Sequence, residues 1–333
     1  SKIKINRVRH LKNIEIPLSD NSCRHLIITG KNGSGKTSLL EALRLFLWLN
    51  HDDPATRSWI ADKLSDNLTF DPLKYQFEIN KFIPKIGRIN HLGKKTPLTL
   101  SKDLSGVEII FQSTDLTKCS LEPKDYILAY YPAERTYLIQ NEKVGKVSFQ
   151  DSYKIYEHPG KDFVKYLKEL YSQEALFRNA GNIERADKIH SWIKNFILTL
   201  RKIYDNDKIN IRLDIEQMKF FIEEPNKNPF SFDELASGYA AILDIITDLM
   251  MRMEKKVGNT YDMPGFVLID EVDAHLHLSL QKNILPTLTS LFPNIQFIVT
   301  THSPFVLSSV SDAVVYNLET NTLVNTDEGL SLL

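Results

Sequence analysis

An eight-residue stretch near the N-terminus constrains this chain more than any other feature of its sequence. The stretch matches G-x-x-x-x-G-K-[ST] at every fixed position and reads Gly30, Lys31, Asn32, Gly33, Ser34, Gly35, Lys36, Thr37. An apolar run at 26–29 precedes it, and apolar residues rich enough for a helix follow from Leu39 to Leu47. A strand, a glycine-containing loop and a helix in this order predict a loop whose backbone N–H groups surround a polyphosphate.

The parts of this loop have distinct expected roles. Lys36 is expected to reach the β- and γ-phosphates, and Thr37 is expected to offer its hydroxyl to Mg²⁺. The first helical turn, which contains Ser38, would add partial positive charge beneath the phosphates. The sequence therefore predicts a site for ATP and Mg²⁺.

Composition sets broader limits on the class of protein. The chain has 333 residues, 42% of them hydrophobic, which is enough for one large domain or two lobes. A formal net charge of −1 gives no global argument for nucleic-acid binding. Two distant cysteines, Cys23 and Cys119, fit no metal-ligand spacing, and no apolar run is long enough for a membrane span or signal peptide. We therefore expect a cytoplasmic protein that does not insert into membranes.

The order of apolar segments predicts an α/β fold. Strands are expected at 3–9, 13–18, 26–29, 75–80, 107–112, 126–131, 209–215, 218–223, 266–270, 295–300 and 313–317. Helices are expected at 238–253 and 275–291, and a helical hairpin is expected at 161–204. The strand–helix–strand order late in the chain is typical of a parallel sheet.

These segments suggest three parts. Residues 1–155 would form an N-terminal ATPase lobe with the phosphate loop and an antiparallel β-subdomain, and residues 156–206 would form a short helical insertion. Residues 207–333 would form a C-terminal ATPase lobe. The predicted sheet is mixed and mostly parallel.

Two carboxylates follow the apolar strand at 266–270. The last residues of a parallel strand emerge at the carboxyl edge of the sheet, where α/β proteins bind ligands. There Asp270 can share Mg²⁺ with Thr37, and Glu271 can orient and polarise an attacking water. An ordinary acidic turn is the alternative, and the metal's need for a protein carboxylate argues against it.

Two further motifs place polar residues at the end of a predicted strand and at the start of a predicted helix. His302 follows the next strand, 295–300, where it can donate to a γ-phosphate; a surface histidine is the simpler alternative. Ser237 and Gly238 open the apolar helix at 238–253. From this pair alone a plain N-cap is the favoured explanation, although a free helix N-terminus can also face phosphate.

Taken together, these motifs resemble the ABC-type ATPases, and within them the SMC, Rad50, RecF and OLD group. In this resemblance residues 30–37 are the Walker A motif, 266–270 is the Walker B strand and Glu271 is the catalytic glutamate. His302 corresponds to the switch histidine, and 235–238 corresponds to the signature motif. The resemblance covers nearly the whole chain and implies the ABC-type head fold.

The resemblance also implies a shared nucleotide site. Ser237 and Gly238 of one subunit would cap the γ-phosphate held by the P-loop of another, so that two ATP molecules lie between the subunits of a head-to-tail homodimer. The opening hairpin at 3–18, which includes Arg9, would pack near the adenine. Lys36, His302 and the partner's Ser237 would stabilise charge, while Glu271 aligns water.

Several positions depart from the pattern of the group. The signature continues with Tyr239 in place of glycine, and His277 stands where the D-loop aspartate is usual. Arg135 stands where a Q-loop glutamine is expected, and Gln140 is a more distant candidate. The insertion at 156–206 is too short for a long coiled-coil arm. The sequence from Asp270 to His277 resembles OLD-type and antiphage ATPases, including the Septu-type and retron-associated ones, more than SMC-like proteins.

Four functions fit this pattern to different degrees. The first is an ATPase that controls a nuclease or toxin effector in antiphage defence, with the effector on another chain or beyond residue 333. The second is a RecF-like or Rad50-like DNA-repair ATPase. The basic segment at 81–102 allows nucleic-acid contact, although a solvated basic hairpin is the favoured explanation of this segment. A transporter subunit and an ATP-binding pseudoenzyme are less favoured, the latter because Lys36, Asp270, Glu271 and His302 are all present.

Overall fold

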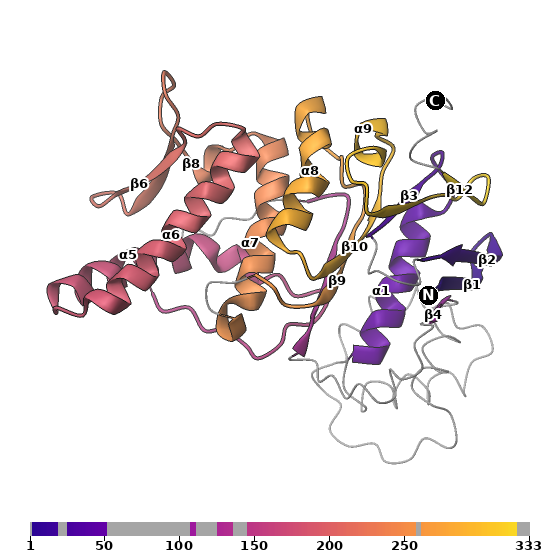
Figure 1. Ribbon diagram of the computed structural model, residues 1–333, viewed down its shortest axis with the longest axis horizontal. Coiled ribbons are helices and arrows are strands. Elements are labelled where there is room, and N and C mark those ends of the chain that lie inside the picture. Colours follow the sequence, from indigo (N-terminus) through magenta and orange to yellow (C-terminus); the bar gives the residue numbers. More distant parts are fainter. Residues whose placement is uncertain are drawn as a thin grey trace, which may run out of the picture.

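The computed structural model covers the 333-residue chain and describes residues 2–18, 25–51, 107–110, 125–135, 145–257 and 261–324. Within these ranges a central sheet is covered by helices on both faces, and a small sheet flanks each layer (Figure 1). The predicted strand at 75–80, the basic segment at 81–102 and Gln140 lie outside the described residues.

The central sheet has the order β12-β11-β3-β10-β9-β5, and its neighbouring strands are parallel except for the β11–β12 pair. The strands are β3 (His25–Thr29), β5 (Ile127–Tyr131), β9 (Gly265–Ile269), β10 (Ile295–Thr300), β11 (Ala313–Asn317) and β12 (Thr322–Val324). Continuous apolar runs in β3, β9 and β10 are typical of strands covered on both faces. The fold is therefore the predicted α/β type, and one sheet contains strands from both predicted lobes.

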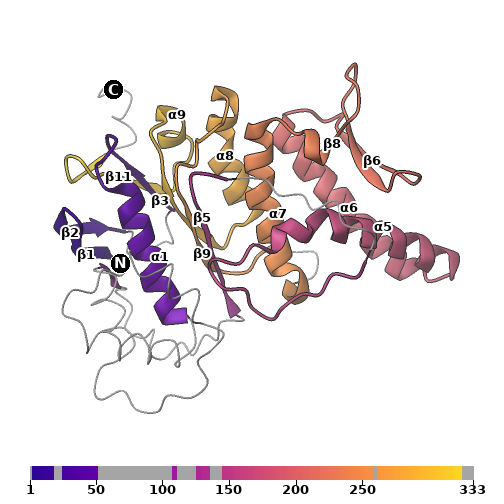
Figure 2. The same cartoon turned by 180° about the vertical axis from the view of Figure 1, so that it is seen from behind.

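The two faces of this sheet carry different layers. On one face α1 (Lys36–His51) packs with an antiparallel sheet of β1 (Lys2–Val8), β2 (Leu11–Pro17) and β4 (Val107–Ile110). On the other face lie α5 (Phe163–Asn179), α6 (Ile183–Tyr204), α7 (Ser237–Val257) and α8 (Leu278–Leu291). Side chains of β10 alternate accordingly, since Ile298 packs with the α1 layer while Phe297 and Val299 pack with the α7 layer. Figures 1 and 2 show α1 and α7 on opposite sides of the sheet.

The N-terminal hairpin confirms the two strands predicted at 3–9 and 13–18. Alternating isoleucines of β1 and β2 are buried, with Ile3 opposite Ile16 and Ile5 opposite Ile14. Arg9 makes the turn with φ +52°, a left-handed conformation that costs a non-glycine residue about 1 kcal/mol. The turn of this hairpin lies next to the phosphate loop.

Helices α5 and α6 form the predicted hairpin at 161–204. Gly181 turns the chain with φ +76°, and the Asn182 side chain caps α6 by accepting from the Arg185 N–H at 3.3 Å. The ring of Phe163 lies 4.8 Å from that of Phe196, and both rings are buried. Burial of such a side chain contributes about 2–3 kcal/mol, which explains why the hairpin is held together by packing.

Helix α8 begins three residues later than the predicted 275–291. Residues 270–275 form turns in which His275 has φ +64°, so the helix cannot extend back to 275. The sheet of β6 (Asn210–Asp214), β7 (Lys219–Glu223) and β8 (Phe230–Ser231) confirms two predicted strands and adds a third. The short helix α9 (Pro304–Leu307) was not predicted either. No helix in the described ranges is long and apolar enough to cross a membrane.

Candidate nucleotide site

Three neighbouring parallel strands deliver the predicted motifs to one edge of the central sheet. β10 pairs with β3 on one side, with Thr300 opposite Ile28, and with β9 on the other, with Val299 opposite Ile269. The phosphate loop, the Asp270–Glu271 pair and His302 follow these three strands directly. The parallel order therefore places His302 next to the acidic pair, as the sequence predicted.

The phosphate loop has the backbone geometry of an anion cradle. Gly30, Gly33 and Gly35 have φ values of +140°, +81° and +99°, which other residues rarely adopt. A Cβ atom at Gly35 would lie 3.0 Å from Leu11 Cδ1, so the N-terminal hairpin also requires glycine there. Lys31, Asn32, Gly33 and Thr37 are exposed, while Ser38 is buried under the loop. Exposed loop residues before a helix N-terminus fit a polyphosphate.

Lys36 is the buried cation of the loop. Its ammonium donates to the carbonyls of Gly30 at 2.8 Å and Lys31 at 3.1 Å. Burial lowers the pKa of Lys36, while the negative charges of Glu271 and Asp270 act in the opposite direction. The lysine therefore lies in the electrostatic field of the acidic pair, which suits a group that binds phosphate beside a metal site.

Asp270 and Thr37 offer the donor set expected for magnesium. The Asp270 carboxylate is buried, and its Oδ1 accepts a hydrogen bond from Thr300 Oγ1 at 2.5 Å. Carboxylate and hydroxyl oxygens are the ligands that Mg²⁺ prefers, together with substrate phosphates. The residues therefore fit the ion, which when bound would neutralise charge on the phosphates.

Glu271 has a strained backbone that is held on both sides. Its φ of +44° lies in the left-handed region, and its N–H donates to Thr300 Oγ1 at 2.7 Å. Strain of this kind costs about 1–3 kcal/mol and clusters at functional sites. The sequence did not indicate Thr300, whose hydroxyl contacts both acidic residues, nor Thr301, which donates to Asp273.

His302 is exposed at the same sheet edge. The following residue, Ser303, is buried; its hydroxyl donates to Gln281 Oε1 at 2.7 Å and caps α9 by accepting from the Phe305 N–H. These contacts fix the chain directly after the histidine, while the imidazole itself faces outward. A contact of His302 with the γ-phosphate stays a prediction.

A cavity of about 490 Å³ adjoins the phosphate loop. Its walls come from the β1–β2 turn, the loop residues 31–34 and the segment after β11. On the hairpin side the cavity is lined by His10, Leu11, Lys12 and Ile14, and His10 Nε2 lies 3.1 Å from the Ser34 carbonyl oxygen. Arg9 is exposed in the turn beside this cavity. Arg9 as a contact to the base stays a prediction, and His10 is a second candidate that the sequence did not indicate.

Ser237 and Gly238 of the signature segment differ in exposure. Ser237 is exposed at the first turn of α7, whereas a Cβ atom at Gly238 would lie 3.0 Å from the His275 carbonyl oxygen. Gly238 thus permits close packing of α7 on the turn after the acidic pair. Tyr239, which replaces the usual glycine, stacks on Tyr204 of α6 with ring centroids 4.1 Å apart. The unusual tyrosine therefore joins the signature segment to the helical hairpin.

A buried charge network fixes α7 to the edge strand β5. Asp248 accepts from Tyr131 Oη and from Arg252 Nε, each at 2.7 Å, and from the Gly160 N–H at 2.9 Å. Burial alone lowers the pKa of His158, but its hydrogen bond to Asp244 at 2.9 Å and the charge of Asp248 raise that pKa overall. A paired, hydrogen-bonded network of this kind gives α7 a fixed position.

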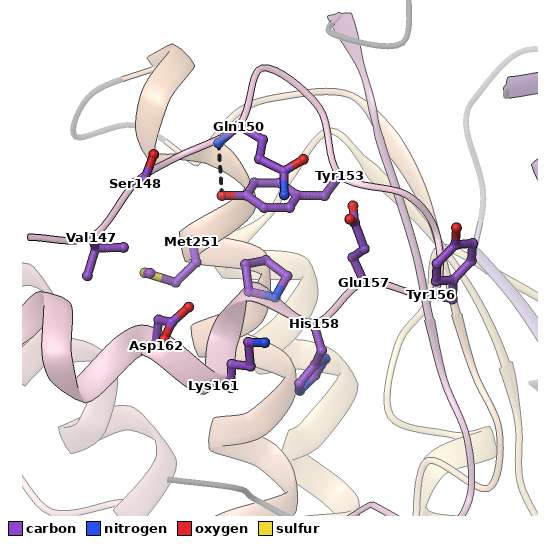
Figure 3. A pocket seen from close by; sticks show the side chains of 11 residues that line it. Val147, Ser148, Gln150, Tyr153, Tyr156, Glu157, His158, Lys161, Asp162 and Met251 are labelled. Carbon is purple, nitrogen blue, oxygen red and sulfur yellow. Dashed lines mark hydrogen bonds between the residues drawn. The ribbon is translucent and has the colours of Figure 1, made fainter. Parts of the chain in front are cut away.

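A second cavity, of about 390 Å³, opens beside this network (Figure 3). His158 and Glu157 line one side, Gln150 and Tyr153 line another, and Met251 of α7 forms part of the floor. The Gln150 N–H donates to the Tyr153 hydroxyl at 3.2 Å, which closes the loop over the cavity. This cavity is lined by residues of 147–162 and α7 and is separate from the phosphate loop.

The chain belongs to a family of ATPase domains described as "AAA domain, putative AbiEii toxin, Type IV TA system", which matches residues 130–308. A second family, described as "AAA ATPase domain", matches residues 1–180. The two matches together span both sides of the site described above, and the chain is an ATPase domain.

Two curated relatives are similar over most of the chain. The Septu protein PtuA of Bacillus mycoides (strain KBAB4) is 27% identical in an alignment 321 positions long, which covers 94% of this chain and 39% of PtuA. The retron Vc95 probable ATPase of Vibrio cholerae serotype O1 biovar El Tor is 23% identical in an alignment 345 positions long, which covers 86% of this chain and 67% of that ATPase. The chain thus spans about two fifths of the length of PtuA.

Solved structures of SMC head domains are also similar. An SMC head bound to the C-winged helix domain of ScpA matches over 99% of this chain and 98% of that one, with 12% identity and a TM-score of 0.45.

Proposed function

We propose that two copies of this chain face one another head to tail and hold two ATP molecules with Mg²⁺ between them. In each shared site one copy would supply the phosphate loop, Asp270, Glu271 and His302, and the other would supply Ser237. Hydrolysis would then open the dimer and change the state of an effector. The observation that carries the proposal is the position of Ser237 relative to the phosphate loop.

Ser237 is exposed at the N-terminus of α7, and α7 lies on the opposite face of the sheet from α1. A helix N-terminus with a free serine hydroxyl attracts phosphate, because its N–H groups and dipole are oriented toward it. Since α1 carries the phosphate loop of its own chain, a phosphate contact by Ser237 is best made with the loop of a second copy. In a dimer with two-fold symmetry, Ser237 of each copy would contact the phosphate held by the other copy.

The residues of the site then divide the chemistry. Lys36 would bind the β- and γ-phosphates, and Thr37 with Asp270 would hold the metal. Glu271 would accept a hydrogen bond from the attacking water and align it, and His302 would donate to the γ-phosphate. Phosphoryl transfer depends mainly on such positioning and charge compensation.

The biological role follows the relatives. PtuA is a Septu protein, and the Vc95 relative is a probable ATPase of a retron. We propose that this chain likewise regulates an effector, a nuclease or toxin, in an antiphage defence complex. The α5–α6 hairpin is a candidate docking surface, since its tip is exposed and Tyr239–Tyr204 stacking joins it to the signature segment.

The test of the shared site is the substitution Ser237→Arg, which puts a bulky cation at the proposed interface. We expect ATPase activity to fall about 100-fold, because one phosphate contact and the dimer are lost together. The ATP dissociation constant of the monomer should change less than about threefold, since the phosphate loop is untouched. Sedimentation with a non-hydrolysable ATP analogue should detect dimer for the unmodified chain and monomer for the variant.

The matched control is Ser191→Arg, on an exposed position of α6. This variant should dimerise and hydrolyse ATP normally. If Ser237→Arg behaves like Ser191→Arg in both assays, the shared site is wrong.

A further inference from the structure

We infer that Arg135 is a positioning residue that holds the backbone of Asp270 and Glu271 in the conformation needed for hydrolysis. The inference rests on the proposed role of Glu271 as the residue that aligns water. Arg135 follows β5, the edge strand next to β9, and stands where a Q-loop glutamine was expected from the sequence.

The guanidinium of Arg135 contacts three backbone carbonyls. Its Nη1 donates to the Asp270 carbonyl at 2.8 Å and to the Pro132 carbonyl at 3.1 Å, and its Nη2 donates to the Glu271 carbonyl at 3.0 Å. Two consecutive peptide units of the acidic turn are therefore joined to one rigid fork. The turn is also joined to β5 directly, since the Asp270 N–H donates to the Tyr131 carbonyl at 2.8 Å.

The backbone that Arg135 holds is the strained one. Glu271 has φ +44°, and such a conformation persists only where the surroundings enforce it. On the N–H side Thr300 accepts from Glu271, and the Thr300 carbonyl accepts from Val272 at 2.9 Å. On the carbonyl side the Glu271 oxygen accepts from Arg135 and from the Ala274 N–H at 2.8 Å. Arg135 is the side-chain contact on the carbonyl side, as Thr300 is on the N–H side.

The charges around Arg135 also support its role as a positioning residue. Burial lowers the pKa of Arg135, while Asp244, Asp270, Asp273 and Glu271 raise it by their negative charges. The guanidinium remains protonated in proteins, so it balances an acidic cluster at the sheet edge. Its charge adds to that of Lys36, which lies in the field of the same carboxylates.

An arginine is the residue type that this geometry needs. Its planar fork offers parallel N–H groups to two adjacent carbonyls, whereas lysine offers one point charge and glutamine a single amide nitrogen. A shift of the Glu271 carboxylate by about 1 Å can reduce a rate about 100-fold without changing substrate binding. The inference therefore predicts a loss in kcat that leaves nucleotide affinity nearly unchanged.

The experiment compares Arg135→Ala and Arg135→Lys with the unmodified chain. We expect kcat for ATP to fall about 100-fold for Arg135→Ala and about 10-fold for Arg135→Lys. Affinity for a fluorescent ATP analogue should change less than about threefold. The matched control is Arg201→Ala, because Arg201 also donates to a backbone carbonyl, that of Ile209 at 2.9 Å, away from the site. This control should keep normal kcat.

A double-mutant cycle separates positioning from a general structural role. If Arg135 acts through Glu271, Arg135→Ala should change the single-turnover rate less than about threefold in the Glu271→Gln background. An equal loss in both backgrounds, or an unchanged kcat for Arg135→Ala, would overturn the inference. A parallel loss of nucleotide affinity would overturn it as well.

The outcomes distinguish the inference from the function on which it rests. Normal hydrolysis by Glu271→Gln contradicts the proposed function, whatever Arg135 does. Slow hydrolysis by Glu271→Gln together with normal hydrolysis by Arg135→Ala contradicts the inference alone. If Arg135→Ala does not fold, as judged by thermal unfolding, the same double-mutant cycle is measured with Arg135→Lys, and its result tests the inference.

Discussion

The substitution Glu271→Gln should reduce kcat for ATP about 1,000-fold while leaving the ATP dissociation constant within about threefold of its normal value. Glutamine has the shape of glutamate and adopts the same strained backbone, so the change removes the carboxylate and little else. The amide cannot accept a proton from water, but the phosphate loop and the Asp270–Thr37 donor set are unaltered. ATP should therefore bind and remain intact.

Trapped ATP should also stabilise the dimer. We expect Glu271→Gln to sediment as a dimer with ATP, whereas the unmodified chain returns to monomer as ATP is consumed. Used as bait in its native host, the trapped form should retain the proposed effector, because the state that binds partners does not decay.

The matched control is Glu224→Gln, in a turn where Glu224 pairs with Lys227 at 2.9 Å. It should hydrolyse ATP normally. Normal turnover by Glu271→Gln would contradict the assignment of this residue, and a lost affinity for ATP would indicate a binding role instead.

The second large effect is expected for Lys36→Ala, which should raise the ATP dissociation constant at least about 100-fold. Lys36 is 6% exposed, and its ammonium lies against the carbonyls of the phosphate loop. Removing a buried, hydrogen-bonded charge from a complex costs about 3 kcal/mol or more, which corresponds to this factor. Isothermal titration with Mg-ATP measures the change directly.

Lys31→Ala provides a control within the same loop. The Lys31 side chain is 81% exposed and pairs with Glu319 at 2.7 Å, so water already screens its charge. The affinity should fall less than about fivefold. Equal losses for the two lysines would mean that charge in the loop matters and burial does not, which contradicts the role given to Lys36.

The convergence of the motifs could be predicted because it depends on chain order. A strand, a helix and a parallel strand in succession place their carboxyl ends at one edge, and β9, α8 and β10 form such a unit. This rule alone predicts that Asp270, Glu271 and His302 lie at the same edge of the sheet. The helical hairpin was predictable for a similar reason, since its apolar side chains repeat at helical spacing.

Contacts between distant segments could not be predicted in this way. Arg135 and Glu271 are 136 positions apart, and their contact depends on β5 pairing with β9 at the sheet edge. Thr300 looked like the end of an apolar strand, yet its hydroxyl is shared by Asp270 and Glu271. Strands β8 and β12, of two and three residues, are too short for periodicity to reveal.

The start of α8 was mispredicted for a local physical reason. The apolar spacing extends back to 275, but His275 has φ +64° and the turn before it is fixed by Asp273 and Thr301. Tertiary contacts of the acidic turn thus override helix periodicity over three residues. Tyr239 was recognised only as a bulkier residue than usual, because its partner Tyr204 lies in another helix.

The most direct measurement of the shared site is the ATPase rate of an equimolar mixture of Lys36→Ala and Ser237→Ala, each with little activity alone. Ser237→Ala removes the phosphate contact without placing a bulky cation at the dimer interface. In a head-to-tail dimer, half of the pairs would be mixed, and each mixed pair would contain one site with both Lys36 and Ser237 intact. The mixture should therefore recover up to about one quarter of the normal rate. A mixture that stays at the sum of its two components, while mixed dimers are detected by mass, would contradict the account.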